Sequence, residues 1–196
     1  IKDIIEEKHE FNRIFNTAKK PLIIIGESAL ELNSGGFIFE ELKNFLYQKK
    51  LISEKWNALN ILPQNASTVG SIDLKFMNYS NENNFIFFDK LKKNQFKIIY
   101  LLGSDNLEIK KNNEFIIYQG SHGDRGAEIA DVILPSPSYT EQNGLYSNLE
   151  GRVQECRKAS YPPGKALEDW KIFNLISKKI DQKFLIKNFD SLRKEV

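Results

Sequence analysis

The sequence predicts an α/β fold: a doubly wound, mostly parallel sheet, followed by an irregular C-terminal hairpin and a closing helix. Short β-branched runs recur along the chain, with helical or connector segments between them. Two of these runs end at Gly26 and Gly103, which favours a tight turn after a buried strand. After residue 144 the apolar runs give way to short alternating segments, which indicate a hairpin.

In the first third of the chain, apolar spacing predicts two helices and two strands. Residues 1–19 carry a helical apolar stripe that ends at a Lys-Lys-Pro sequence. The β-branched run at 22–26 is typical of a strand buried on both faces. The second helix begins at Ser34 or Gly35, and residues 56–62, closed by a proline, form the second strand.

The remainder of the chain predicts three more strands, at 98–103, 115–118 and 132–134, and a hairpin over 144–153. A final helix is expected at 165–179, with an apolar stripe of Trp170, Phe173, Ile176 and Ile180. The segment 66–74 is ambiguous and suits a short helix, whereas the asparagine-rich segment 77–84 predicts a loop. We expect residues 1–196 to form a single domain or domain fragment.

Composition excludes several classes of function. With 28 Lys and Arg against 26 Asp and Glu, the chain has no concentrated basic charge, so we expect no nucleic-acid partner. The single cysteine, Cys156, cannot by itself hold an iron–sulfur cluster or a zinc site. No apolar run approaches the length of a transmembrane helix, so no direct membrane span is expected.

The segment from Tyr118 to Arg157 gathers the polar residues that could form a site. Its glycine-rich turn, residues 120–126, allows close approach of the backbone. His122 could serve as a general base, and Asp124 is expected to cap the helix that follows. Because no nucleophile accompanies the histidine in a known pattern, we favour a structural strand–turn–helix over a catalytic site.

A second polar group follows, formed by Glu141, Asn148, Glu150 and Arg152. These side chains could do acid–base work or hold a phosphate group or an acceptor-rich ring. The alternative, which we favour, is that their hydrogen bonds hold an irregular loop together. A nucleotide site at the glycine-ended strands is a further alternative, but neither strand completes a phosphate-binding fingerprint.

These motifs carry a family resemblance. The stretch IADVILPSPSYTEQNGLYSNLEGRVQ at residues 129–154 resembles the molybdopterin oxidoreductase superfamily. With YQGSHGDRGAEIADVILP at 118–135 and PPGKALEDWKI at 162–172, it is similar to the large iron–sulfur subunits of respiratory complex I, NADH:ubiquinone oxidoreductase. KKPLIIIGESAL and WNALNILPQNAS extend the resemblance upstream, so that it covers residues 19 to about 176.

The resemblance implies a molybdopterin oxidoreductase-like domain that has lost its cofactor. Asn148, Glu150, Gly151 and Arg152 match the family's Asn-x-Glu-Gly-Arg pattern near the pterin pocket. In this branch, however, the iron–sulfur clusters belong to a cysteine-rich N-terminal region that is absent from this sequence. We therefore assign no catalytic, cofactor-binding or metal-binding residue, and expect no cofactor in this chain.

The function implied is that of a non-catalytic structural domain in the peripheral arm of complex I. As part of the complex it would support electron transfer from NADH to ubiquinone without being catalytic itself. Its partners would be the iron–sulfur N-terminal part of the same subunit and other peripheral-arm subunits. The expected location is the matrix side of the mitochondrial inner membrane, or alternatively the cytoplasmic face of a bacterial plasma membrane. The alternative function is a domain of a true molybdopterin-dependent oxidoreductase.

Overall fold

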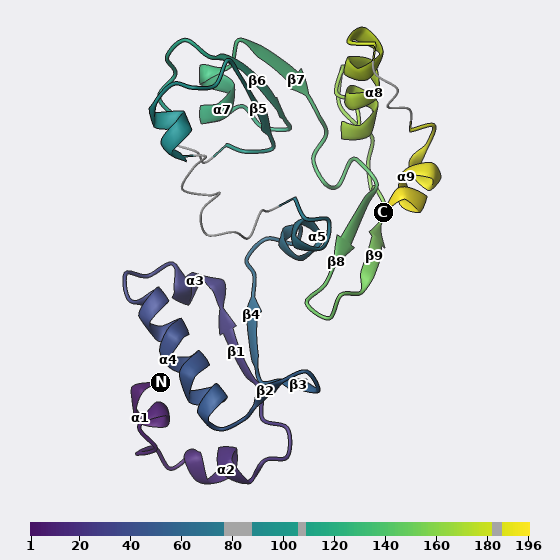
Figure 1. Cartoon of the computed structure of the whole chain (residues 1–196). Coiled ribbons are helices and arrows are strands. Elements are labelled where there is room, and N and C mark those ends of the chain that lie inside the picture. Colours follow the sequence, from purple (N-terminus) through teal and green to yellow (C-terminus); the bar gives the residue numbers. More distant parts are fainter. Residues whose placement is uncertain (77–87, 106–108, 182–185) are drawn as a thin grey trace. The chain divides into compact units, whose positions relative to one another are not determined.

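The computed structural model describes residues 1–76, 88–105, 109–181 and 186–196 (Figure 1). The chain divides into two compact units, Ile1–Val69 and Gly70–Val196. The first is called unit 1 and the second unit 2. The expectation of one domain over residues 1–196 stays a prediction, as does the loop expected at 77–84, which lies outside the described residues.

Unit 1 begins with two short helices, α1 (Lys2–Ile5) and α2 (Asn12–Thr17), so the prediction of one helix over residues 1–19 is wrong. The chain turns at Glu7, whose φ of 57° is left-handed. The backbone N–H groups of Lys8 and His9 both donate to the carbonyl oxygen of Asp3, at 2.8 and 3.2 Å. These bonds close the turn that ends α1, and a helical stripe in the sequence cannot reveal them.

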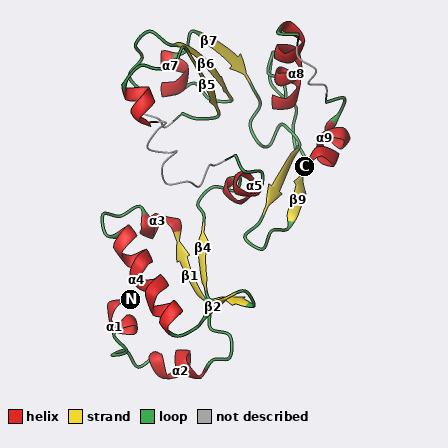
Figure 2. Cartoon of the chain, viewed as in Figure 1, coloured by secondary structure: helices red, strands yellow, loops and turns green. Residues whose placement is uncertain are grey.

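A parallel pair of strands, β1 (Ile23–Gly26) and β4 (Leu59–Leu62), forms the centre of unit 1. Helix α4 (Gly35–Gln48) lies along this pair, after the one-turn helix α3 (Glu27–Leu30) (Figure 2). A small antiparallel pair, β2 (Ile52–Ser53) and β3 (Trp56–Asn57), precedes β4. The strand predicted over 56–62 is therefore two segments, β3 and β4.

The core of unit 1 lies between α4 and one face of the β1–β4 pair. It consists of Phe15, Ile25, Leu42, Phe45, Leu46, Ala58 and Leu59. The expectation that the strand at 22–26 is buried on both faces is wrong for unit 1, since Ile25 is 6% exposed and Ile24 57%. Helix α4 begins at Gly35 as predicted. This position requires glycine, because a Cβ there would lie 1.9 Å from the carbonyl oxygen of Leu30.

Unit 2 contains three parallel strands in chain order: β5 (Ile98–Leu102), β6 (Phe115–Gly120) and β7 (Val132–Pro135). One face of this sheet carries Ile99, Leu101, Ile116 and Tyr118, which pack against apolar residues that include Ala127 and Ile129 around helix α7 (Arg125–Ile129). On the other face, the ring of Tyr100 stacks on that of Phe173 in α8 (Asp169–Lys179), with centroids 5.8 Å apart. Elements on both faces and parallel pairing confirm the predicted α/β class.

The rest of unit 2 is a hairpin with helices around it. Strands β8 (Gly144–Ser147) and β9 (Val153–Cys156) pair antiparallel, as predicted. Helix α5 (Thr68–Asp73), which spans the boundary between the two units, lies in the ambiguous segment 66–74 that suited a short helix. Helix α9 (Phe189–Glu195), which the sequence did not predict, begins with a capping box between Asn188 and Ser191.

Helix α8 begins later than predicted. The backbone N–H of Leu167 donates to the carbonyl oxygen of Pro135 at 3.2 Å, so the residues before α8 are tied to the end of β7. The predicted apolar stripe is also only partly buried: Trp170, Phe173 and Ile176 are half-buried, and Ile180 is 62% exposed. Within the described part of the chain, no helix has both the length and the apolar character needed to cross a membrane.

Candidate functional site

Tyr118 is at the centre of the glycine-rich turn. Strand β6 places its ring in the core, where the residue is 2% exposed. Its hydroxyl oxygen lies 2.7 Å from the carbonyl oxygen of His122 and 3.1 Å from Oδ2 of Asp105. Burial and the Asp105 carboxylate raise the pKa of Tyr118 to about 12, so the phenol is a proton donor at neutral pH.

The glycines of the turn make room for this tyrosine. A Cβ at Gly120 would lie 2.2 Å from the hydroxyl oxygen of Tyr118, and one at Gly126 would lie 2.8 Å from a ring carbon. A Cβ at Gly123, by contrast, would meet nothing within 4 Å. The close approach that the sequence predicted for residues 120–126 is therefore made to a side chain of the protein itself.

Asp105 fixes the start of α7. Its Oδ1 accepts a hydrogen bond from the backbone N–H of Gly126 at 3.0 Å. Asp124 occupies the N-cap position of α7, but its side chain makes no capping bond, so its predicted role is wrong. A residue from the end of β5 does this work instead, 21 positions away in the sequence.

The remaining polar residues of the turn are exposed. Nδ1 of His122 lies 2.9 Å from the hydroxyl oxygen of Ser121, and both side chains face solvent. Asp105, Gly123, Asp124, Arg125 and Glu128 line an open hollow of about 430 Å³ beside them. Among the residues that the structure describes, no group of three or more His, Cys, Asp and Glu side chains is arranged to hold a metal ion.

Asp131 holds the start of β7 against the neighbouring strand. Its Oδ1 lies 2.6 Å from Nζ of Lys111, and its Oδ2 accepts from the backbone N–H of Ile116 at 2.8 Å. The Lys111 ammonium and the Ile116 amide lower the pKa of the Asp131 carboxyl. Because both carboxylate oxygens of Asp131 have partners within the chain, this side chain serves to hold the strands together.

The hairpin turn is organised by Asn148. Its Oδ1 accepts from the backbone N–H groups of Glu150 and Arg152, at 3.0 and 2.9 Å. Gly151 completes the turn with a left-handed φ of 76°. The side chains of Glu150 and Arg152 are exposed, so in this motif the side chain of Asn148 holds the turn. The structural role favoured for the whole group stays a prediction.

Two other residues considered from the sequence, Glu141 and Cys156, lie in a local turn and in a strand. Oε2 of Glu141 accepts from the backbone N–H of Ser138 at 3.0 Å and so closes a local turn. Cys156 is half-buried on β9, where it pairs with Gly144 across the hairpin.

The structure brings together a polar cluster that sequence reasoning missed. Oδ1 of Asp169 accepts from Nε2 of Gln119 at 2.6 Å, and Oδ2 accepts from Nε2 of Gln142 at 3.1 Å. The hydroxyl of Tyr100 donates to Oε1 of Gln119. We call these four residues the Asp169 junction. A helix-start signal in the sequence could have pointed to Asp169, but the two glutamines are 50 and 27 residues away from it and carry no local pattern.

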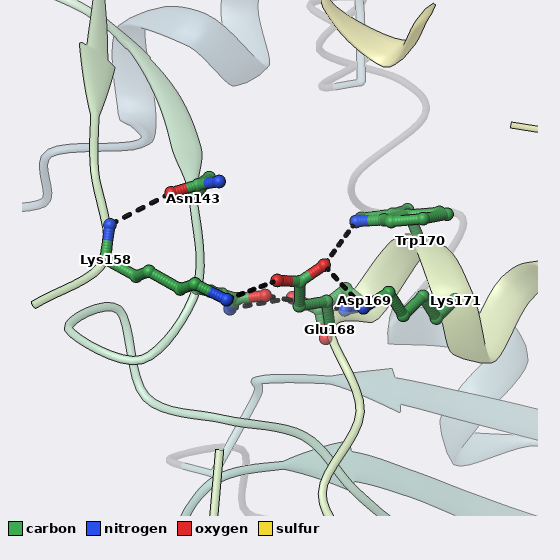
Figure 3. A network of polar contacts seen from close by, with 7 residues as sticks. Asn143, Lys158, Glu168, Asp169, Trp170 and Lys171 are labelled. Atoms are coloured by element: carbon green, nitrogen blue, oxygen red, sulfur yellow. Dashed lines mark hydrogen bonds and ion pairs between the residues drawn. The ribbon is translucent and has the colours of Figure 1, made fainter. Parts of the chain in front are cut away.

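Glu168 forms a second group next to this junction (Figure 3). Its Oε2 accepts from Nε1 of Trp170 at 2.9 Å and lies 3.2 Å from Nζ of Lys171. Its Oε1 lies 3.7 Å from Nζ of Lys158, whose backbone N–H donates to Oδ1 of Asn143 at 3.0 Å. Two consecutive carboxylates at the start of α8 therefore collect contacts from several distant segments.

Comparison with known proteins defines the class. The chain belongs to the molybdopterin oxidoreductase family, whose model, described as "Molybdopterin oxidoreductase", matches residues 1–179. Within that class, the chain is similar to the NADH-ubiquinone oxidoreductase 75 kDa subunit of Reclinomonas americana. The two are 41% identical over 191 residues, which is 97% of this chain and 27% of that protein.

Two further relatives have comparable similarity. The NADH-ubiquinone oxidoreductase 78 kDa subunit, mitochondrial, of Candida albicans is 41% identical over 90% of this chain and 24% of its own length. An NADH-quinone oxidoreductase subunit of Rickettsia typhi is 40% identical over 90% of this chain and 25% of its own length. The chain thus spans about a quarter of the length of these relatives.

The family name implies a pterin cofactor, so the fit of the matching residues can be examined. The oxygen of Asn148 is engaged with two backbone amides of its own turn. Glu150 and Arg152 are exposed on that turn, and the space between Gly120 and Gly126 is filled by the ring of Tyr118. In this arrangement the chain itself occupies the Asn148 oxygen and the space at Gly120 and Gly126.

Proposed function

We propose that this chain is a non-catalytic structural domain of the peripheral arm of respiratory complex I. In that role it supports electron transfer from NADH to ubiquinone by the whole assembly. One observation carries the proposal: the side-chain oxygen of Asn148, in the family motif, accepts from two backbone amides of its own hairpin turn. Side chains used in this way are not free to bind a substrate or to move its protons.

The relatives support the complex I part of the proposal. Their names identify subunits of NADH-ubiquinone and NADH-quinone oxidoreductases, and the similarity runs over at least nine-tenths of this chain. We propose as partners the iron–sulfur N-terminal part of the same subunit and other peripheral-arm subunits. The proposed location is the matrix side of the mitochondrial inner membrane, or the cytoplasmic face of a bacterial plasma membrane.

We also propose that the chain itself holds no cofactor. Iron–sulfur clusters require several thiolate ligands, and the chain has one cysteine, Cys156. The electrons would then pass through clusters in other parts of the assembly, and this chain would contribute packing surfaces.

A domain of a true molybdopterin-dependent oxidoreductase is the second candidate. Membership of the family favours it, together with the match of Asn148, Glu150 and Arg152 to the family's motif. In that case a conformation different from the one described would have to release the Asn148 oxygen from the hairpin turn.

The two candidates differ in what the native assembly contains. The assembly that includes this chain would be purified from its source, and its iron, molybdenum, tungsten and extractable pterin measured per mole of chain. The structural proposal expects iron from the associated clusters, NADH:ubiquinone reductase activity, and neither molybdenum, tungsten nor pterin. Stoichiometric pterin with either metal would overturn it and support the second candidate.

A further inference from the structure

The loop that leads from the sheet of unit 2 to the hairpin has little regular structure. It spans residues 136–143 and is called the linker loop. Its first residue, Ser136, donates its backbone N–H to the carbonyl oxygen of Gly120 at 3.1 Å. Further along, the carbonyl oxygen of Thr140 accepts from the backbone N–H groups of Ala159 and Ser160, at 2.8 and 3.1 Å. The loop therefore lies beside the segment that leaves the hairpin.

Both ends of the hairpin are attached to the first residues of α8. Before β8, Nε2 of Gln142 donates to Oδ2 of Asp169 at 3.1 Å, and Oε1 of Gln142 accepts from the Asp169 backbone N–H at 3.4 Å. After β9, the ammonium of Lys158 lies 3.7 Å from Glu168, and its backbone bonds to Asn143 (Figure 3). These contacts therefore fix the segments just before β8 and just after β9 to the start of α8.

The carboxylate of Asp169 suits this position chemically. It offers two acceptor oxygens, one to Gln119 on the sheet and one to Gln142 on the linker loop. Gln119 is completely buried, so its amide cannot turn to water if the carboxylate is lost. An amide in place of this carboxylate has one acceptor and one donor group, and would leave one glutamine N–H facing another N–H.

We infer that Asp169 and Glu168 act as a latch that holds the linker loop and the hairpin onto the sheet of unit 2. Asp169 is a positioning residue in this device. Loss of its carboxylate releases residues 136–159 as one cooperative segment, while β5, β6 and the body of α8 stay folded. The inference rests on the contacts of the free chain and does not depend on the proposed function.

There is a physical reason why the hairpin segment can detach while the β5–β6 sheet stays folded. The β5–β6 sheet has its own apolar core on the other face, formed by Ile99, Leu101, Ile116 and Tyr118. The hairpin, by contrast, has strands of four residues each, and β9 is largely exposed. Two-stranded hairpins of this size are marginally stable by themselves, so their contacts with neighbouring elements decide whether they stay in place. Besides the contacts at its ends, the hairpin has a bond from Ser147 to Asp73 and one from Arg193 to Glu155.

Native-state hydrogen exchange on the full 196-residue chain tests the latch. In Asp169→Asn, exchange at the backbone amides of Glu141, Lys158 and Ala159 is expected to accelerate about tenfold or more, as for loss of buried hydrogen bonds. Exchange in β5 and β6 is expected to stay within about twofold of the wild type. Asp190→Asn, which removes an exposed carboxylate from the first turn of α9, controls for helix-dipole effects and should change neither region.

A second variant keeps the test decisive if Asp169→Asn does not fold. Gln142→Ala removes the contact on the loop side and leaves the buried bond between Gln119 and Asp169 intact. It should accelerate exchange over 136–159 selectively, by a smaller factor. Unchanged exchange in both variants would overturn the latch, and so would an equal acceleration in the hairpin and in β5–β6, which would make Asp169 a general stabilising residue.

Discussion

Tyr118 explains why a glycine-rich turn follows β6. The ring is buried against the turn, and its hydroxyl bonds to Asp105 and to the backbone of His122. Glycine-rich turns after parallel strands often bring a backbone close to a phosphate group. Here the backbone comes close to a phenol ring instead, so two of the three glycines are required by packing within the chain.

Alanine substitutions at two of these glycines can show whether packing against Tyr118, rather than backbone flexibility, requires glycine. Gly120→Ala is expected to lower the free energy of unfolding by about 2–3 kcal/mol, because the new Cβ overlaps the Tyr118 hydroxyl. Gly123→Ala is the matched control, with open space around its Cβ, and should change stability by less than about 0.5 kcal/mol. Urea unfolding of both variants gives the comparison. Equal losses in the two would mean that the Tyr118 contact is not the cause.

At the scale of elements, capping and turn residues decide where helices and strands end. Helix α7 is fixed by Asp105 from a different strand end, whereas α9 carries its own capping box at Asn188 and Ser191. The hairpin depends on Asn148, which organises its turn through two backbone amides. Local signals are therefore reliable where the partner is a few residues away, and misleading where it comes from another element.

The turn of the hairpin provides a prediction at this scale. Asn148→Ala removes the acceptor shared by the Glu150 and Arg152 amides and should cost about 1–2 kcal/mol of unfolding free energy. Asn148→Asp retains an acceptor oxygen and should lose clearly less. The two variants would be compared by chemical denaturation, with exchange of the Arg152 amide as a local measurement. A similar loss in both would exclude this hydrogen bonding as the reason for the asparagine.

For the molecule as a whole, buried phenols link stability to alkaline pH. Burial raises the pKa of Tyr118 to about 12, and burial also raises the pKa of Tyr100 and Tyr146. The folded state retains these protons at a pH where the unfolded chain releases them from tyrosines of ordinary pKa near 10.0. The contribution of Tyr118 to stability is therefore complete below about pH 10 and is lost as the pH rises toward 12. Tyr100 and Tyr146 act in the same direction.

Removing one phenol tests this linkage. Tyr118→Phe should be less stable at neutral pH by about 1 kcal/mol, because it loses its hydroxyl bonds, but its stability should fall less steeply above pH 10. Tyr161→Phe changes an exposed ring and should retain the steep decline. Thermal unfolding at a series of alkaline pH values measures both slopes. An unchanged slope in Tyr118→Phe would exclude Tyr118 as a source of the alkaline loss.

Prediction from the sequence succeeded where a signal is local. The glycine-ended strands, the helix beginning at Gly35 and the hairpin were all confirmed. The helix expected over 1–19 was wrong, because the bonds to the Asp3 carbonyl that break it follow from a left-handed residue, Glu7. Asp124 was expected to cap α7, but Asp105 does so from 21 residues away.

The sequence by itself determined the α/β class, the family and the segment that carries the family's motifs, because these depend on residue order along short stretches. Tertiary structure decided what the polar residues of that segment do. In the folded chain, Asn148 bonds to the backbone of its own turn, and Tyr118 fills the space between two glycines. Gln119 and Gln142 both donate to the carboxylate of Asp169. Such pairings join residues tens of positions apart, and only folding of the chain brings their donors and acceptors within hydrogen-bond distance.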